Sequence, residues 1–460
     1  MESRKLKEKE LLELESKYCS YGDTVHYLEN PIIFERCEGS WIFDMQGRPY
    51  LDMQMWYSAV NFGYRNKEIE DAHHRQMATL PQVASQYLHK EKILLASAIA
   101  KETEKRFGTK GRVHFNVGGS QAIEDSLKLV RNYKKGRSLT FAFMGGYHGR
   151  TLAATEITSS FRYRKRYGHF GSRATFIPYP YCFRCFYGKN LKDCGYECIK
   201  HFEKLFETEY YGVIDKKDNE VEYAAFYIEP LQATGGYIVP PPEYFKKLSA
   251  VLQKYGILLV DDEIQMGFYR TGKLWATEHF GIKPDIVAFA KSLTNGLNPL
   301  SGIWAKEDLI NPLIFPPGST HSTFSSNPLG TAAGLATMEY IKKNNFEEIV
   351  PGKGEYILSR LKDLQKKHKV IGDVDGLGLA VRVEMTKPDG FTPDRELTDR
   401  IFQEGMKGDI KINRKKFGLV LDVGGYYKNV FTLAPALTIA YAEIDLFIEL
   451  FESLLKRCGV

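Results

Sequence analysis

The stretch Ile286-Val287-Ala288-Phe289-Ala290-Lys291 is a short apolar run that ends in a lysine. A second apolar run upstream, Ile257-Leu258-Leu259-Val260, ends in Asp261-Asp262-Glu263. Runs of this length are typical of strands that are buried in a parallel sheet. An ammonium group that points into an apolar interior is costly unless it is paired or used covalently. Taken alone, Lys291 could also be a strand-end lysine whose ammonium group reaches water.

The pattern around these two runs predicts an α/β fold. From about residue 110 to 330, β-rich apolar runs alternate with helical patterns. Because such alternation places helices on the faces of a mostly parallel sheet, we expect the functional site at the carboxyl ends of the strands. The predicted strands are 113–116, 138–142, 224–228, 257–260 and 286–290, and the predicted helices are 121–133, 242–254 and 329–343.

Three parts are expected along the chain. Residues 61–335 form the predicted large domain, in which 178–221 reads as a cysteine-containing insertion. Residues 336–460 show two amphipathic helices with intervening strands, which predicts a smaller α+β domain. Residues 1–60 contain a hairpin-like segment at 41–52, and we expect them to contribute to the small domain and to the entrance of the active site.

Composition excludes several classes of function. The chain has 460 residues, of which 43% are hydrophobic and 26% charged, as in ordinary globular proteins. The net charge of +6 is spread over 63 basic and 57 acidic residues, which is too dilute for a nucleic-acid partner. Neither a secretory signal nor an apolar segment of membrane-spanning length is recognised, so a cytoplasmic protein without a membrane partner is expected.

Four of the seven cysteines form a cluster with the spacing Cys182-x2-Cys185-x8-Cys194-x3-Cys198. Disulfides are not expected in a reducing compartment. The spacing suits a structural zinc site with four thiolate ligands. The alternative is a set of free thiols in an aromatic-rich surface insertion.

Two glycine-rich turns follow predicted strands. Asn116-Val117-Gly118-Gly119-Ser120 opens a helix, where glycines and unpaired backbone N–H groups can hold a phosphate, although most such turns bind nothing. Gly145-Gly146-Tyr147-His148-Gly149-Arg150 follows the next strand, and Tyr147 there could lie flat against a planar ring. An incidental aromatic in a glycine-rich loop explains this second turn equally well.

The residues after the second apolar run supply matching polar groups. A carboxylate at Asp262 would hold a pyridine nitrogen protonated, and a protonated ring withdraws electrons from a carbanion. Gln265 could bind the phenolic oxygen of the same ring. Together with Lys291, these groups fit pyridoxal phosphate held as a Schiff base.

On these motifs the chain resembles class III, fold-type-I pyridoxal-phosphate aminotransferases, the group with the ornithine, lysine-ε, 4-aminobutyrate and ω-amine transaminases. The resemblance covers about residues 21–437 and is most specific at 262–302, which has Asp-Glu-x-Gln, Arg-Thr-Gly, Pro-Asp-Ile and the lysine in family order. It implies a large domain with a mostly parallel seven-stranded sheet flanked by helices, plus a smaller α+β domain. It also implies a homodimer, or a dimer of dimers, whose subunits share active sites.

The resemblance assigns roles residue by residue. Lys291 matches the Schiff-base lysine that also moves the proton, and Asp262 matches the partner of the pyridinium, with Asp261 as an ordinary strand-end residue. Thr323, in His-Ser-Thr-Phe-Ser-Ser-Asn-Pro at 321–328, should reach the phosphate of the neighbouring subunit. The remaining predicted cofactor contacts are Gly119, Ser120, Tyr147, His148, Glu229 and Gln265.

Departures from the family pattern concern the substrate. Thr432 stands where the family commonly has a carboxylate-binding arginine, and Thr234 stands where ornithine-type members have a glutamate that gates this arginine. Arg150 could take over carboxylate binding. Alternatively, the donor lacks a nearby carboxylate, as in a diamine, an aryl amine or a β-aminoacyl thioester. Trp56 and Tyr57 are predicted to wall the substrate channel, with core packing as the other interpretation.

The predicted reaction is amino transfer from an ω- or β-amine donor to an oxo-acid by a ping-pong Schiff-base mechanism. A racemase, aminomutase or lyase with the same cofactor is the alternative, because related proteins have these activities. A dinucleotide-binding oxidoreductase is a third hypothesis. It lacks a Gly-x-Gly-x-x-Gly after the first strand and leaves Lys291 without a role.

Overall fold

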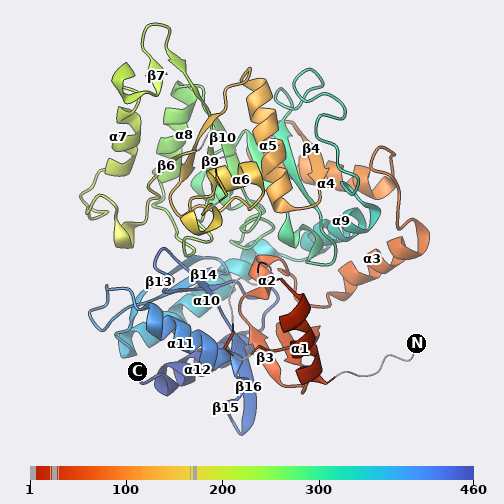
Figure 1. Ribbon diagram of the computed structural model, residues 1–460, viewed down its shortest axis with the longest axis vertical. Helices are drawn as coiled ribbons and strands as arrows, with labels where there is room; N and C mark the ends of the chain where they lie inside the picture. Colours follow the sequence, from red (N-terminus) through yellow and green to blue (C-terminus); the bar gives the residue numbers. More distant parts are fainter. Residues whose placement is uncertain (1–6, 21, 23–27, 30, 166, 169–173) are drawn as a thin grey trace.

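A seven-stranded sheet forms the centre of the larger part of the molecule (Figure 1). The computed structural model describes residues 7–20, 22, 28–29, 31–165, 167–168 and 174–460. The strands in spatial order are β4 (Gly111–Asn116), β12 (Ser301–Lys306), β11 (Ile286–Phe289), β10 (Leu258–Asp262), β9 (Tyr223–Ile228), β5 (Leu139–Phe143) and β6 (Thr175–Ile177).

This sheet is mostly parallel, as predicted. β12 alone runs antiparallel to its neighbours β11 and β4, while β11, β10, β9, β5 and β6 pair in parallel. The five predicted strands are all present to within two residues at each end. β6 and β12 were not predicted. The predicted α/β architecture with a mostly parallel seven-stranded sheet is confirmed by this sheet.

Helices cover both faces of the sheet, which explains why its inner strands, such as β9 and β11, are apolar and buried. α5 (Gly119–Tyr133) and α6 (Leu152–Ile157) pack on one face, and α7 (Glu197–Lys204) and α8 (Tyr244–Lys254) pack on the other. α5 buries its apolar stripe, including Ile123, Leu127 and Val130, against the sheet. The remaining long helices of this part are α3 (Lys67–Thr79), α4 (Lys90–Phe107) and α9 (Pro328–Lys343).

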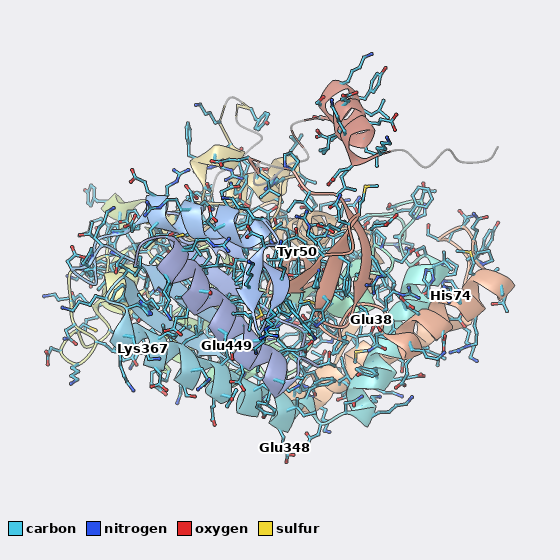
Figure 2. The ribbon with its side chains drawn as sticks, turned by 90° about the horizontal axis from the view of Figure 1, so that it is seen from below. Glu38, Tyr50, His74, Glu348, Lys367 and Glu449 are labelled. Atoms are coloured by element: carbon cyan, nitrogen blue, oxygen red, sulfur yellow. The ribbon has the colours of Figure 1, made fainter. Side chains whose placement is uncertain are left out.

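Two smaller sheets lie in the other part of the molecule, where the C-terminal segment is drawn in blue (Figure 1). Figure 2 shows the helices that cover them from below. Three helices are present there, where the sequence pattern predicted two. These helices are α10 (Phe346–Lys367), α11 (Arg395–Met406) and α12 (Tyr441–Arg457). One sheet has the order β13 (Ile371–Leu377), β14 (Ala380–Met385), β18 (Val430–Leu433), β17 (Asp422–Gly424).

The second small sheet contains strands from both ends of the chain. β3 (Pro49–Asp52) pairs in parallel with β16 (Lys415–Val420), with Leu51 opposite Leu419. The hairpin predicted at 41–52 is therefore built into a sheet with C-terminal strands. The sheet order is β1 (Phe34–Glu38), β2 (Trp41–Asp44), β3, β16, β15 (Ile410–Ile412). The domain boundaries at 60 and 335 stay a prediction.

Two further elements complete the description. The predicted insertion contains α7 and a short hairpin of β7 (Ile214–Asp215) and β8 (Glu220–Val221). α1 (Glu8–Tyr18) precedes the hairpin at the N-terminal end. None of the helices in the described part of the chain combines the length and the apolar character needed to cross a membrane.

Candidate active site

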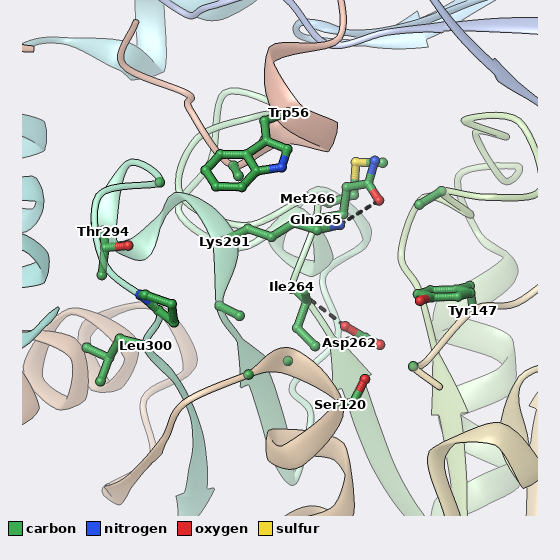
Figure 3. A pocket seen from close by; sticks show the side chains of 18 of the residues that line it. Trp56, Ser120, Tyr147, Asp262, Ile264, Gln265, Met266, Lys291, Thr294 and Leu300 are labelled. Atoms are coloured by element: carbon green, nitrogen blue, oxygen red, sulfur yellow. Dashed lines mark hydrogen bonds between the residues drawn. The ribbon is translucent and has the colours of Figure 1, made fainter. Parts of the chain in front are cut away.

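A cavity of about 430 Å³ lies at the carboxyl ends of β4, β10 and β11 (Figure 3). Its wall combines strand ends, the first turn of α5, the loop after β5 and the loop that follows Lys291. Nine of the predicted residues line it: Trp56, Gly119, Ser120, Tyr147, His148, Glu229, Asp262, Gln265 and Lys291. Four predicted residues, Tyr57, Arg150, Thr323 and Thr432, do not belong to this lining.

Lys291 directs its side chain into the cavity from the end of β11. The strand ends at Phe289, and Lys291 takes a left-handed conformation with φ of 42°, which turns the chain away from the sheet. Its Nζ donates a hydrogen bond of 2.9 Å to Oε1 of Gln265. Burial lowers the pKa of Lys291 to about 8, partly offset by the negative charges of Asp262 and Glu229. About a tenth of this amine is therefore neutral, and nucleophilic, at pH 7, far more than for a lysine with the usual pKa of 10.5.

Asp262 is buried at the end of β10 and is fixed from two sides. Its Oδ1 accepts a hydrogen bond of 3.1 Å from the backbone N–H of Ile264. Its Oδ2 lies 2.8 Å from Nδ1 of His148. Burial of His148 disfavours the imidazolium, but the bond and charge of Asp262 outweigh burial and raise the pKa of His148. The pair thus keeps a carboxylate oriented at the bottom of the cavity.

Gln265 connects the lysine to a second buried residue. Its Oε1 accepts from Lys291, and its Nε2 donates a hydrogen bond of 2.8 Å to the hydroxyl of Tyr237. Tyr237 is fully buried, so the amide orientation is set from behind. Tyr237 was not predicted, since a lone tyrosine far along the sequence carries no motif.

The start of α5 forms a cradle suited to an anion. Gly119 and Ser120 are the first residues of the helix, where backbone N–H groups have no acceptor within the helix. A Cβ on Gly119 would lie 3.1 Å from Cδ1 of Ile264, so a side chain here would crowd the wall. A Cβ on Gly149 would lie 2.3 Å from Oγ of Ser120. Only glycine at 149, which has φ of 128°, lets the next loop lie against this helix start.

Glu229 holds the loop that carries Tyr147. Its two carboxylate oxygens accept hydrogen bonds of 2.7 Å from the backbone N–H groups of Tyr147 and Ala233. Burial raises the pKa of Glu229 to about 7, partly offset by His148. The Tyr147 ring lies across the cavity from Lys291 (Figure 3). Glu229 therefore positions the Tyr147 loop through the backbone.

Trp56 enters the cavity wall from a strained turn. Residues 55–58, labelled α2 (Met55–Ser58) in Figure 1, have φ values between 45° and 65°, which is the left-handed region, and none of them is glycine. Such backbone costs an L-residue roughly 1–2 kcal/mol. The Trp56 ring, 57% exposed, lies above Lys291 and packs 3.2 Å from where a Cβ on Gly296 would stand. We refer to residues 55–58 as the left-handed turn.

The other predicted substrate residues lie near the cavity. Tyr57 follows Trp56 in the left-handed turn, and burial raises its pKa to about 12. The Arg150 guanidinium lies 5.9 Å from the Tyr147 ring centroid and 4.4 Å from that of Tyr163. The hydroxyl of Thr432 donates a hydrogen bond of 2.6 Å to Asp422, a carboxylate that was not predicted.

Thr323 is exposed on the surface, outside the cavity of its own chain. Its neighbour Phe324 is 71% exposed. This position is compatible with a contact to another subunit and gives Thr323 no role within the single chain. Its predicted contact with a neighbouring phosphate stays a prediction.

The structure gives no support to the zinc site. Cys182, Cys185, Cys194 and Cys198 surround one small cavity in the insertion, and all four are free thiols. Within the described part of the chain, no three His, Cys, Asp or Glu side chains are arranged to hold a metal ion. Burial, together with the neighbouring cysteines of the cluster, raises the pKa of Cys182 and Cys198 to about 11, so both are protonated thiols in the metal-free chain. The free-thiol alternative describes this arrangement better.

The expectation that Asp261 is an ordinary strand-end residue was wrong. Asp261 is fully buried, and its carboxyl group lies beside that of Glu263. Burial raises its pKa well above the usual range, and burial likewise raises that of nearby Glu263 to about 8. The two carboxyl groups behind the cavity floor are therefore not both ionised at neutral pH.

A buried amine of lowered pKa, a fixed carboxylate on the neighbouring strand and an anion cradle at a helix start, all on this sheet, define the site of a fold-type-I pyridoxal-phosphate enzyme. Residues 24–455 match the model of the family described as Aminotransferase class-III. The chain belongs to this family and is a pyridoxal-phosphate-dependent aminotransferase by family membership.

Relatives within the family carry different activities. A leucine/methionine racemase of Thermococcus litoralis is 32% identical over 444 residues, which cover 96% of this chain and 94% of the relative. A 5-aminovalerate aminotransferase of Pseudomonas aeruginosa is 30% identical, covering 90% of this chain and 91% of the relative. The solved (S)-enantioselective ω-transaminase of Thermomicrobium roseum has a TM-score of 0.86 and 26% identity, covering 99% of this chain and 100% of that structure.

Proposed function

We propose that the protein transfers an amino group from an ω- or β-amine donor to an oxo-acid by ping-pong kinetics, with pyridoxal phosphate held on Lys291. The observation that carries this proposal is the buried Nζ of Lys291, with a pKa of about 8, in a cavity that also contains the fixed carboxylate of Asp262. When bound, pyridoxal phosphate supplies an electron-withdrawing ring that stabilises negative charge at the substrate carbon.

The donor groups of the cavity fit this cofactor. Asp262, held by His148, is suited to the ring nitrogen, and Gln265 is suited to the phenolic oxygen. The helix start at Gly119 and Ser120 is suited to the phosphate. The Tyr147 ring lies across the cavity from Lys291, where a planar ring could stack on it.

The ionisable groups of the cavity favour amino transfer over racemisation. A transaminase moves its proton along one face with one base, whereas inversion needs a proton from the opposite face. Besides Lys291, the described lining has four ionisable side chains. His148 and Asp262 bind each other, and Glu229 binds two backbone N–H groups. Burial raises the pKa of Tyr147, which makes this phenol a poor base. Lys291, with a pKa of about 8, is the base suited to hold and move the proton.

Racemisation remains a second candidate because two relatives, at 32% identity each, are named as racemases. A racemase needs no oxo-acid. An enzyme that consumes its amine only when pyruvate or 2-oxoglutarate is present is a transaminase. Turnover of one amino-acid enantiomer into the other without an oxo-acid would support the racemase and contradict our proposal.

The donor is proposed to lack a carboxylate next to the reacting carbon. Thr432 bears no positive charge, and its hydroxyl binds the carboxylate of Asp422. An anionic group placed there would meet a negative neighbour, which is unfavourable. Amines such as diamines, aryl amines or β-aminoacyl thioesters avoid this conflict. If a donor carries a distant carboxylate, Arg150 is the proposed partner for it.

We also propose a homodimer in which Thr323 of each subunit contacts the phosphate site of the other. The exposure of Thr323 and Phe324 supports this arrangement. Sedimentation of the holoenzyme, compared with that of a Phe324→Asp variant, tests it. A monomer with full activity would contradict a shared site.

The experiment that tests the cofactor assignment combines absorption with borohydride trapping. The protein with added pyridoxal phosphate should be yellow, and reduction should leave the phosphopyridoxyl group on the peptide that contains Lys291. Lys291→Ala should remove both signals. Lys306→Ala is a matched control, because Lys306 lies on the adjacent strand β12 and pairs with Asp285 at 2.6 Å. A label on another lysine would overturn the assignment.

A further inference from the structure

The left-handed turn at residues 55–58 depends on support from outside. Four consecutive residues with positive φ, none of them glycine, are disfavoured on their own and persist only where their surroundings determine them. The turn lies between the large sheet and the small domain and carries Trp56 over the cavity (Figures 1 and 3). Whatever holds the turn therefore also places Trp56.

Asp52 holds the beginning of the turn. Its Oδ1 accepts hydrogen bonds of 2.8 Å and 2.9 Å from the backbone N–H groups of Gln54 and Met55. Its Oδ2 accepts a bond of 2.8 Å from the hydroxyl of Tyr64. These contacts fix where the turn starts. At its end, the backbone N–H of Ser58 donates a hydrogen bond of 3.2 Å to the carbonyl oxygen of Gln54, and Oγ of Ser58 donates one of 2.8 Å to Oδ1 of Asn61.

Arg270 holds the end of the turn. Its Nε donates a hydrogen bond of 2.9 Å to Oγ of Ser58, and its Nη2 donates one of 2.6 Å to Oδ1 of Asn61. Its Nη1 donates to the backbone carbonyl groups of Leu379 and Pro435, at 3.1 Å and 2.6 Å. One guanidinium group thus joins the turn to two segments from the C-terminal part of the chain.

The partners of Arg270 indicate a geometric role. The side chain is fully buried, and the four acceptors named above are all neutral. Burying a charge without a counter-charge is expensive, so an ion-pairing function does not explain the residue. The planar fork of arginine, in contrast, fixes several acceptors at once. Phe268 and Tyr269, with φ of 54° and 68°, bend the chain just before Arg270.

We propose that Arg270 is a positioning residue for amine selectivity, which acts by fixing the left-handed turn so that Trp56 lies over Lys291. This inference rests on the proposed function for its kinetic consequence, because Trp56 would limit the size of the donor. The structural part, that Arg270 sets the position of Trp56, is independent of the reaction. A fluorescence measurement therefore tests the structural part, and a kinetic measurement tests the effect on amine selectivity.

The first variant is Arg270→Lys in the holoenzyme, with Arg382→Lys as the matched control. Arg382 is also almost fully buried, but it binds Glu384 on the same strand and Tyr181 of the insertion, and it does not touch the turn. Acrylamide quenching of Trp56 fluorescence, isolated by subtraction of a Trp56→Phe protein, reports the position of Trp56. We expect quenching to change at least about twofold in Arg270→Lys and to stay unchanged in Arg382→Lys.

The kinetic readout is the ratio of kcat/KM for a bulky aryl amine to that for a small alkyl amine. Arg270→Lys should change this ratio about tenfold, mainly through KM, whereas Arg382→Lys should leave it unchanged. Equal losses for both amines with unaltered quenching would overturn the proposal. If no amine reacts with any protein, the proposed function fails, while quenching still decides whether Arg270 places Trp56.

A pair of second-site variants distinguishes positioning from stability alone. Ser58→Gly and Ser58→Ala both remove the hydroxyl that Arg270 binds, but only glycine adopts the φ of 65° at this position without strain. In the Arg270→Lys background, Ser58→Gly should restore the amine ratio to within about threefold, and Ser58→Ala should not. Identical behaviour of the two would overturn the proposal. Ser58→Ala alone replaces Arg270→Lys as the test if the latter does not fold.

Discussion

The floor and the wall of the cavity are built by different means. Lys291 and Asp262 on the floor extend from neighbouring strands, whose pairing fixes their separation. The wall residue Trp56 sits in the left-handed turn, which depends on the side chains of Asp52 and Arg270. The regular sheet thus fixes the reactive groups, whereas a few hydrogen bonds between distant parts of the chain shape the space above them. Damage to the floor should stop the chemistry, and damage to the wall should change only what fits.

The largest effect is expected at the floor. Asp262→Asn removes the negative charge while keeping the shape, so kcat should fall by at least about 100-fold, the order associated with loss of a preorganised electrostatic partner. The ratio of kcat/KM for a bulky aryl amine to that for a small alkyl amine should stay the same. Steady-state kinetics with both amines measure this. A loss smaller than about threefold would contradict the role of Asp262.

A smaller and more selective effect is expected at the wall. Trp56→Ala should change kcat/KM for an aryl amine by about 10- to 100-fold, the range for contacts in an apolar pocket. For a small alkyl amine, kcat/KM should change by less than about threefold, and the protein should keep its yellow chromophore. Equal changes in kcat/KM for both amines would mean that Trp56 acts on the reaction itself, like Lys291 and Asp262, and not on the choice of amine.

The pH dependence of cofactor attachment isolates the floor. Attachment needs the neutral amine, and burial lowers the pKa of Lys291 to about 8, so the rate should rise about tenfold from pH 7 to pH 9 and then level off. Stopped-flow absorbance after mixing the apo-protein with pyridoxal phosphate measures it. A lysine with an ordinary pKa would show a rate that keeps rising through pH 10.

The smallest effect is expected behind the floor. Burial raises the pKa of Asp261 and Glu263 above their unfolded values of 3.8 and 4.5, so the folded protein binds more protons and loses stability as pH rises toward about 8. Asp261→Asn removes one buried acid and should stabilise by about 1 kcal/mol at pH 8. Denaturant unfolding at pH 5 and pH 8 tests this. If Asp261→Asn raised the free energy of unfolding more at pH 5 than at pH 8, the predicted pH dependence would be contradicted.

The floor could be predicted from the sequence because strand-end residues follow apolar runs. Lys291, Asp262 and Gly119 each come directly after such a run, and the cavity brings them together. β12 escaped prediction, since Gly302 interrupts its apolar pattern, and a Cβ there would lie 2.4 Å from the carbonyl oxygen of His114. The burial of Asp261 was missed as well, because a carboxyl group at a strand end usually reaches water.

The wall could not be predicted to the same extent. Trp56 and Tyr57 were proposed as channel residues, but the left-handed conformation that places them leaves no periodic pattern in the sequence. Arg270 stood in a recognised Arg-Thr-Gly motif without an assigned partner. Its contacts with Ser58, Asn61, Leu379 and Pro435 join positions far apart in the chain, and such contacts appear only once the chain has folded.

The pairing of β3 with β16 has a consequence for folding during synthesis on the ribosome. Residues 49–52 can pair with β2 at once, but their second strand partner, residues 415–420, is made only at nearly the end of translation. At about 5–20 residues per second, the N-terminal hairpin waits on the order of a minute. The left-handed turn follows β3 directly, and Arg270 needs Pro435 as well. The nascent chain can therefore assemble its central sheet early, whereas the contacts that hold the left-handed turn over the cavity form last.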